Sequence, residues 1–172
     1  MLDIIKNRRS IRKFKEHTLS KETIQEIIKG GLLAPTSKNK KPVEFIVVEE
    51  REDLLKLKYC KNKGNIGFET ASCAIVVVAD SQKSDVWIED ASIAASYMQL
   101  QAGALGLSSV WIQIRKRQSD FDDSNNIVKE ILNIPDNFSV LCILLLGYKD
   151  ENRSSYEESD IDYSKVHYGK YQ

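Results

Sequence analysis

Two uninterrupted apolar runs constrain the fold of this chain more than any other feature of its sequence. Residues 73–79 read CAIVVVA and residues 140–146 read VLCILLL, with no charged residue in either run. A half-exposed strand alternates apolar and polar side chains, whereas a strand buried on both faces is apolar throughout. The first run is therefore predicted to be an interior strand, and the second to be the middle of a strand over 139–147. Both runs are far too short to cross a bilayer.

Helical patterns surround these strands. Ser20 is an expected N-cap, apolar side chains recur after it at helical spacing, and Pro35 disfavours further helix, so a helix is predicted over 20–33. The longest expected helix, over 85–105, is rich in small residues, and we expect it to be central, buried and part of a subunit interface. The alternation of helices and strands predicts an α/β or α+β fold in which helices cover a sheet. Further helices are expected at 2–6, 51–59 and 125–132, and further strands at 43–48 and 108–114.

Length and charge exclude several classes of protein. A chain of 172 residues suits a single domain, which we expect over 1–172. Lys and Arg total 25, as do Asp and Glu, so no global field indicates a nucleic-acid or membrane partner. The N-terminus does not resemble a signal peptide, and we expect a cytoplasmic protein. From about 149 to 172 the chain is polar but rich in tyrosine, which predicts an arm docked on the surface.

The cysteines and histidines indicate no metal or disulfide chemistry. Cys60, Cys73 and Cys142 are widely spaced and form no CxxC pair, so free thiols in a reducing compartment are expected. His17 and His167 are the two histidines of the chain, and they show no HExxH-like spacing. We therefore expect no metal site.

The segment RRSIR at residues 8–12 is the first pattern with chemical meaning. Guanidinium groups bind phosphate oxygens in a bidentate manner, and a serine hydroxyl adds a neutral donor. Short basic runs are also common on protein surfaces, so these residues alone leave open a solvated basic turn.

A second pattern lies in the loop 34–42, which reads APTSKNKKP. Its small side chains let a flat ring approach the backbone, while Thr36, Ser37 and Asn39 can reach the polar edge of such a ring. An ordinary turn between a helix and a strand accounts for the loop as well. No GxGxxG follows a strand and no GxxxxGK[ST] is present, so neither a dinucleotide-binding fold nor a P-loop is predicted.

Together and in this order, these motifs resemble those of the nitroreductase family. The basic segment continues into Lys13-Phe14, and WIEDASIAA at 87–95 opens the long helix. GLSSVWI follows that helix at 106–112, Ile134-Pro135 precedes the last strand, and LGY closes it at 146–148. The resemblance covers nearly the whole chain.

The resemblance implies an α+β sandwich with a central mixed sheet flanked by helices. It also implies an intertwined homodimer with one FMN in each of two pockets at the subunit interface. Arg8 and Ser10 would then hold the FMN phosphate, with Arg9 beside them, and Arg12 would lie toward the ribityl chain and the N1/O2 edge of the ring. The loop of the other subunit would approach the flavin, and strand 108–114 would place a backbone N–H near N5. The implied cofactor residues are Arg8, Arg9, Ser10, Arg12, Pro35, Thr36, Ser37, Asn39, Trp111, Ile112, Gln113 and Lys165.

Two positions depart from the family pattern. Lys41 stands before Pro42, where many relatives have glutamine. The basic phosphate contact after the last strand has two candidates in this chain, Arg153 and Lys165, and Lys165 is the one included in the set above.

The implied function is electron transfer from NADH or NADPH, through FMN, to small planar acceptors such as nitroaromatics or quinones. No dedicated acid or base is required, because the flavin carries the hydride and the protein mainly positions it. Two alternatives stay open: other flavin chemistry of the same family, namely dehydrogenation, dehalogenation or flavin fragmentation, and storage or sensing of FMN without turnover.

Overall fold

The computed structural model describes residues 1–171 and contains a four-stranded sheet. The strands are β1 (Val43–Val48), β2 (Cys73–Asp80), β3 (Ser108–Gln113) and β4 (Phe138–Gly147), in the spatial order β1-β2-β4-β3. Each neighbouring pair is antiparallel. The two apolar runs lie in β2 and β4, which are the central strands, while β1 and β3 form the edges.

The predicted α+β class is confirmed, but the prediction of a mixed sheet is wrong for these four strands. Among residues 1–171, parallel pairing is restricted to an isolated bridge between Ser10 and Ser109, where the N-terminal segment lies along β3. A run of apolar residues indicates that a strand is buried on both faces, but it does not indicate whether the strand is parallel or antiparallel to its neighbours. Both kinds of strand have the same apolar pattern when they are covered on both faces. The direction of the strands therefore had to come from the structure.

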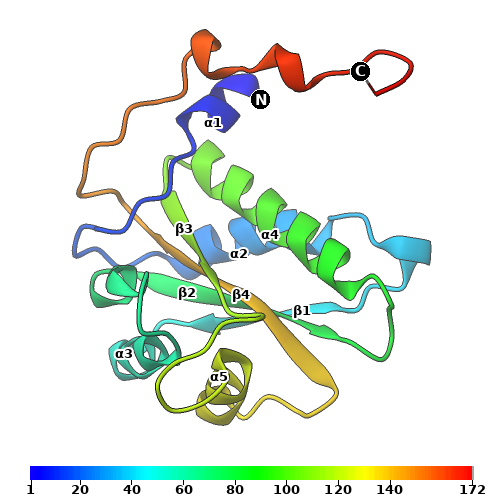
Figure 1. Ribbon diagram of the computed structural model, residues 1–172. Coiled ribbons are helices and arrows are strands. Elements are labelled where there is room, and N and C mark those ends of the chain that lie inside the picture. Colours follow the sequence, from blue (N-terminus) through cyan, green and yellow to red (C-terminus); the bar gives the residue numbers. More distant parts are fainter. Residues whose placement is uncertain (172) are drawn as a thin grey trace.

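Helices cover both faces of the sheet (Figure 1). α2 (Lys21–Leu32) and α4 (Trp87–Ala104) lie on one face, and α3 (Arg51–Leu57) and α5 (Ser124–Leu132) lie on the other. The short α1 (Leu2–Asn7) packs against the C-terminal part of α4. As predicted, Ser20 caps α2, and its hydroxyl accepts the backbone N–H of Thr23 at 3.2 Å. No helix within residues 1–171 is both long enough and apolar enough to cross a membrane.

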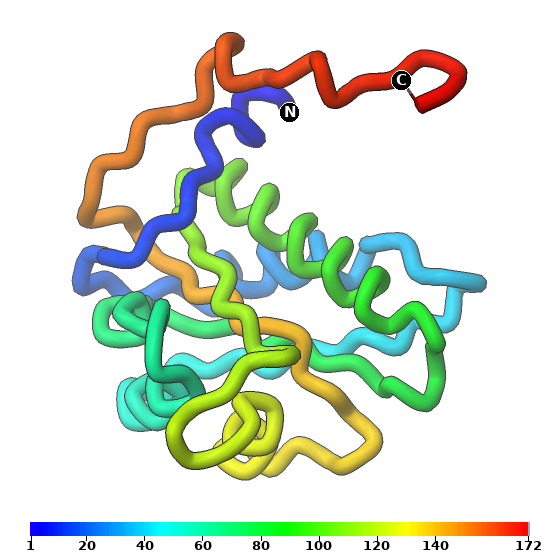
Figure 2. Tube along the Cα trace, in the orientation of Figure 1, coloured from blue at the N-terminus to red at the C-terminus, as the bar shows by residue number. Residues whose placement is uncertain are grey.

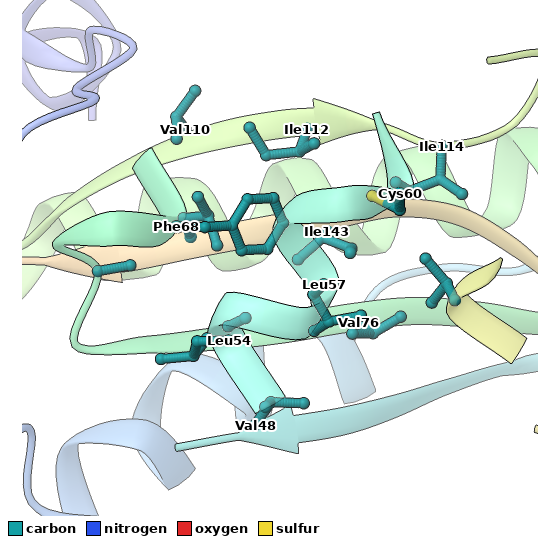
Figure 3. Close-up of a cluster of buried hydrophobic side chains, with 14 of the residues drawn as sticks. Val48, Leu54, Leu57, Cys60, Phe68, Val76, Val110, Ile112, Ile114 and Ile143 are labelled. Atoms are coloured by element: carbon teal, nitrogen blue, oxygen red, sulfur yellow. The ribbon is translucent and has the colours of Figure 1, made fainter. Parts of the chain in front are cut away.

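Two hydrophobic clusters hold these three layers together. Side chains of β2 alternate between them: Val76 packs toward α3 and α5, and Val77 packs toward α2 and α4. Figure 3 shows the first cluster, in which the fully buried ring of Phe68 lies among aliphatic side chains of the sheet and of α3. A strand that supplies both clusters must be apolar at every position, which explains the runs seen in the sequence.

A β-bulge interrupts the pairing of β2 with β4. The register shifts by one residue at Leu141, so Leu141 and Cys142 both face the layer of α2 and α4. The carbonyl of Leu141 accepts the backbone N–H groups of Ile114 and Arg115, at 3.2 and 3.1 Å. The bulge thereby ends β3 and starts the basic turn 115–117.

Most alanines of α4 pack within the chain, and a place of this helix in a subunit interface stays a prediction. Ala91, Ala95 and Ala102 are fully buried in the cluster formed with the sheet and α2. Close approach of α2 also depends on Gly31, where a Cβ atom would lie 2.6 Å from the ring of Phe45. Small side chains on both helices therefore serve the layer packing of one chain, and a different face of α4 is left exposed.

The C-terminal arm docks over its first part and then leaves the body of the protein. The backbone N–H of Tyr156 donates to the carbonyl of Lys6 at 3.0 Å, and the Lys6 ammonium pairs with Glu158 at 2.7 Å. Further along, Tyr168 and Tyr171 are 85% and 90% exposed, and Figure 2 shows the end of the chain extending past α1. The arm is thus docked on the surface, as predicted, up to about residue 158. Beyond that residue its tyrosines are largely exposed to solvent.

All three thiols are predicted to be unreactive in the folded protein. The cysteines are free and buried, and burial raises the pKa of Cys60 and that of Cys73 to about 12. Burial also raises the pKa of Cys142 well above its usual range. Because the thiolate is the reactive form, a chromogenic disulfide reagent at mildly alkaline pH should label none of them until guanidinium unfolds the chain. Rapid labelling of a native thiol would contradict this packing.

Candidate functional site

The basic segment 8–12 is anchored by its single apolar residue. Ile11 is buried in the cluster under α3 and α5, and its N–H donates to the carbonyl of Ser109 on β3 at 3.1 Å. The preceding helix α1 ends at this point, where the N–H of Arg8 donates to the carbonyl of Ile4. The basic residues on either side of Ile11 are therefore held at the edge of the sheet.

Two hollows adjoin this segment and share three arginines, Arg8, Arg9 and Arg153. One hollow has a volume of about 230 Å³ and also contacts Gly103 of α4 and Ser109 of β3. The other has a volume of about 190 Å³ and is completed by Ser10, Arg12 and Tyr156. We call the residues Arg8, Arg9, Ser10, Arg12 and Arg153 the arginine pocket. Ligand pockets usually enclose roughly 300–1,000 Å³, so a large ligand bound here needs walls that this chain alone does not supply.

Arg8 is the cation in this pocket that has no protein partner. It is half-buried, and within residues 1–171 its guanidinium makes no hydrogen bond or ion pair. A partly desolvated guanidinium without a partner is a costly arrangement, and an anion relieves it. This supports a ligand phosphate more than it supports a solvated basic turn.

Arg9 is used to hold the C-terminal arm. Its guanidinium donates to the carbonyl of Ser154 and lies over the ring of Tyr156, 4.3 Å from the ring centre. These contacts fix the arm beside the basic segment and bring Arg153 into the pocket. Lys165, by contrast, lies on the exposed part of the arm and pairs with Asp162 at 3.5 Å. Within this chain, Arg153 and not Lys165 stands with the arginines of residues 8–12, and a role for Lys165 at the pocket stays a prediction.

A carboxylate borders the same region. Glu151 accepts the backbone N–H of Arg12 at 2.5 Å, and its other oxygen pairs with Arg153 at 3.5 Å. The hydrogen bond from Arg12 lowers the pKa of Glu151, which therefore remains ionised at neutral pH. Glu151 orients the backbone of Arg12 and offsets one of four positive charges, so the arginine pocket keeps a net positive charge.

The open edge of β3 continues from the pocket. The carbonyl of Ser109 points away from β4, because it accepts from Ile11. In an antiparallel strand both backbone groups of a residue point to the same side, and successive residues alternate. The N–H groups of Trp111 and Gln113 therefore point away from β4 as well, toward the open edge.

The side chains at these positions have structural partners. The indole N–H of Trp111 donates to the side-chain oxygen of Gln113 at 2.8 Å, and the Gln113 amide donates to the carbonyl of Arg115 at 3.0 Å. Ile112 is buried in the core. Of the three predicted residues on β3, Trp111 and Gln113 can thus offer backbone donors to a flat ring, whereas Ile112 contributes to the core behind them.

The loop 35–39 is tied to α4 by a buried carboxylate. Asp90 is 3% exposed; one of its oxygens accepts the backbone N–H of Ser37 at 2.8 Å, and the other accepts the hydroxyl of Ser84 at 3.2 Å. The hydroxyl of Thr36 is used within the loop, where it accepts the N–H of Lys41. Pro35 and Asn39 are exposed, and Asn39 has a φ of 52°. The loop is therefore a hydrogen-bonded turn with left-handed backbone that presents Pro35 and Asn39 outward.

The loop and the arginine pocket lie at opposite ends of α4 (Figure 1). The loop is bound to Asp90 in the first turn of this helix, and the pocket contacts Gly103 in its last turn. At 1.5 Å per residue these two positions are about 20 Å apart along the helix axis. One chain thus brings the predicted residues of 8–12 to the strand that carries the predicted residues 111–113, and leaves those of 35–39 at a distance.

Comparisons with known proteins show the family of this chain. A model of the nitroreductase family matches residues 5–66 and 49–148. The chain belongs to the nitroreductase family. Among sequence relatives within the family, a protein of Archaeoglobus fulgidus provisionally named NADH dehydrogenase/NAD(P)H nitroreductase is 37% identical over 92% of this chain and 91% of its own length.

Solved nitroreductase structures have the same fold. An FMN-dependent nitroreductase from Clostridium difficile R20291 has 48% sequence identity and a TM-score of 0.96, with 99% of this chain and 100% of that chain covered. An NADPH:FMN oxidoreductase from Vibrio harveyi, solved with NAD⁺, has 26% identity and a TM-score of 0.84, with 99% of this chain and 77% of that chain covered. Fold and size both place this chain with the short members of the family.

Two features of the site were not assigned from the sequence. Arg153 was one of two candidates, and only the docking of the arm by Arg9 separates it from Lys165. Asp90 lies within the WIEDASIAA motif, but its contact with Ser37 joins residues far apart in the chain. An aspartate in the first turn of a helix predicts a favourable interaction with the helix dipole; it does not predict which loop the carboxylate holds.

Proposed function

We propose that this protein holds FMN with its phosphate in the arginine pocket and passes electrons from NADH or NADPH to small planar acceptors, nitroaromatics or quinones. Membership of the family makes the protein an FMN-dependent oxidoreductase that uses NAD(P)H. That nitroaromatics or quinones accept the electrons is what we propose beyond this. Three unpaired thiols suit a protein that works in the reducing cytoplasm.

One observation carries the proposal: the arginine pocket continues directly into the open edge of β3. An unpartnered Arg8 supplies a site for a phosphate, and the backbone donors of Trp111 and Gln113 lie further along the same edge. A ligand with a phosphate at one end and a flat, hydrogen-bonding ring at the other fits this order of groups. FMN has this form.

A second chain completes the site in this proposal. The loop 35–39 is about 20 Å from the arginine pocket within one chain by the length of α4, and the hollows at the pocket are too small to enclose a flavin. The exposed side chains of Ile93 and Tyr97 on α4, together with the tyrosine-rich arm, offer apolar surface to a partner copy. We therefore propose a homodimer in which the loop of one chain reaches the flavin held by the other.

The residues of this chain bind and orient, and bound FMN supplies hydride-transfer chemistry at its ring. Arg8, Ser10 and Arg153 would hold the phosphate by charge-assisted hydrogen bonds. The backbone N–H groups of β3 would fix the ring plane. Lys165, placed by the family resemblance, would reach a pocket only if the exposed arm crosses to the partner chain.

Arg12 would tune the flavin electrostatically. A cation near the N1/O2 edge stabilises the negative charge of the reduced ring more than it stabilises the oxidised ring. Arg12→Gln should therefore lower the two-electron midpoint potential, and about 30 mV corresponds to about 1.4 kcal/mol. A spectroelectrochemical titration measures the shift. An unchanged potential together with a large loss of oxidised FMN affinity would reassign Arg12 to the phosphate, since Arg12 lines the same hollow as Arg8.

Anaerobic stopped-flow spectroscopy tests the function. The FMN-loaded protein should lose its yellow colour on mixing with NADH or NADPH and regain it with a quinone or a nitroaromatic compound. A flavin that either nicotinamide reduces but neither acceptor reoxidises would favour other chemistry of the family. A flavin that neither nicotinamide reduces would favour storage, and a protein that is colourless after added FMN is removed by gel filtration would exclude all of these functions.

A further inference from the structure

A second cationic surface lies beyond the other end of β3. Lys61 and Lys63, from the loop before Phe68, and Arg117, from the turn after β3, line a cavity of about 350 Å³ together with Asn62 and Gln118. We call Lys61, Lys63 and Arg117 the cationic cradle. Neither the family resemblance nor the proposed function uses these residues.

The backbone of the cradle is held in place by hydrogen bonds. The side chain of Asn62 donates to the Asp120 carboxylate at 2.6 Å and accepts the Asp120 N–H at 3.1 Å, which joins the two loops. Asn65 donates to the carbonyl of Lys61 at 2.6 Å. Ser124 donates its N–H to the carbonyl of Arg117 at 2.9 Å. The backbone that carries these cations is therefore held in place before any ligand binds.

The cradle carries three positive charges that are not used in ion pairs within the described part of the chain. Within residues 1–171, none of its three cations forms an ion pair. The acidic residues nearest in sequence hydrogen-bond to neutral donors: Asp120 to Asn62, and Asp122 and Asp123 to groups of their own loop and of α5. Partial burial and, next, the charge of Arg117 lower the pKa of Lys61. A bound anion would relieve this repulsion.

The cradle lies in line with the proposed flavin. The open edge of β3 runs from Ser109 at the arginine pocket to the turn at Arg115, which is about 20 Å at 3.3 Å per residue. A flavin with its phosphate at the pocket directs its ring toward the cradle. In the proposed site, the cradle would therefore border the place where a substrate meets the ring.

We propose that the cationic cradle binds the anionic group of a small molecule that exchanges electrons at the flavin, an inference that rests on the proposed function. The group is a phosphate, carboxylate or sulfonate, carried either by the nicotinamide dinucleotide or by an anionic acceptor. Three cations that line one cavity suit one such group. A polynucleotide needs a longer basic track, and the chain as a whole has no net charge.

The two half-reactions separate the two sources. If the cradle binds a phosphate of the nicotinamide dinucleotide, reduction of the flavin by NADH and NADPH should slow about tenfold in the double variant Lys61→Gln/Arg117→Gln. If only the reaction with NADPH slows, the bound group is the 2′-phosphate, which NADH lacks. If the cradle binds the anionic group of the acceptor, reoxidation of the flavin by a sulfonated quinone should slow by the same factor. The rate of reoxidation by a neutral quinone should then stay within twofold of the wild-type rate. Lys21→Gln, an exposed lysine of α2, is the matched control and should change neither half-reaction.

A binding measurement keeps the inference testable apart from turnover. Calorimetry should show inorganic pyrophosphate binding to the FMN-saturated wild type, where the arginine pocket is occupied, and about tenfold weaker binding to the double variant. Equal pyrophosphate affinities, or unchanged rates in both half-reactions, would overturn the inference. If neither nicotinamide reduces the flavin, the proposed function fails, and the pyrophosphate result alone then decides whether the cradle binds anions.

Discussion

Replacing Arg8 with alanine should weaken FMN binding roughly 10- to 100-fold, because a charge-assisted hydrogen bond to a phosphate contributes about 1.5–3 kcal/mol. The side chain is half-buried and its guanidinium has no protein partner within residues 1–171, so its removal breaks no hydrogen bond or ion pair of the folded chain. Fluorescence titration of the apoprotein with FMN measures the change.

Riboflavin provides the control for this variant. It lacks the phosphate, so its affinity should fall by less than threefold or so when Arg8 is replaced. The same pair of titrations on Arg153→Ala should give a similar difference between the two ligands, since Arg153 lines the same hollow. Equal losses of FMN and riboflavin affinity in both variants would mean that these arginines act on the fold and that the pocket does not bind the phosphate.

Asp90→Ala should destabilise the protein by about 3 kcal/mol, because each buried donor left without an acceptor costs about 1–3 kcal/mol. The two donors are the N–H of Ser37 and the hydroxyl of Ser84, which is 1% exposed. Urea unfolding measures the loss. FMN affinity should also fall, since the loop that presents Pro35 and Asn39 would lose its attachment to α4.

The matched variant is Asp90→Asn. Its amide oxygen can still accept from Ser37, and the hydroxyl of Ser84 can turn to accept from the amide nitrogen. The asparagine variant should therefore retain most of the stability and of the FMN affinity. An alanine variant as stable as the wild type, with unchanged FMN affinity, would show that the carboxylate does not hold the loop.

The parts of the fold that follow from local sequence were predictable. The helix 20–33 has a capping serine and a following proline, and β1 covers residues 43–48 as predicted. The layering of helices on both faces of the sheet followed from the apolar runs. These features depend on periodicity and on end signals, which neighbouring residues carry.

Features that depend on contacts between distant residues were not predictable. The bulge at Leu141 lies inside a run in which every residue is apolar, so the sequence shows no break in alternation that would indicate it. The alanines of α4 indicated close packing, but not that the neighbour would be α2 of the same chain. At the site, the basic segment was recognisable from its composition, whereas the engagement of Arg9 with the arm and of Asp90 with Ser37 required the folded chain.

A flavin site shared between two chains can be tested directly by combining a chain with a defective loop and a chain with a defective phosphate pocket. Ser37→Pro removes the N–H that donates to Asp90, and Arg8→Ala removes the cation that is proposed to bind the FMN phosphate. Chains carrying one defect each can be co-expressed with different affinity tags, and the mixed dimer isolated. In that dimer both defects fall on one site and the other site is intact, so FMN should bind with wild-type affinity to half of the sites. Binding as weak as in the two parent variants, or a monomer in light scattering that retains FMN, would contradict a site built from two chains.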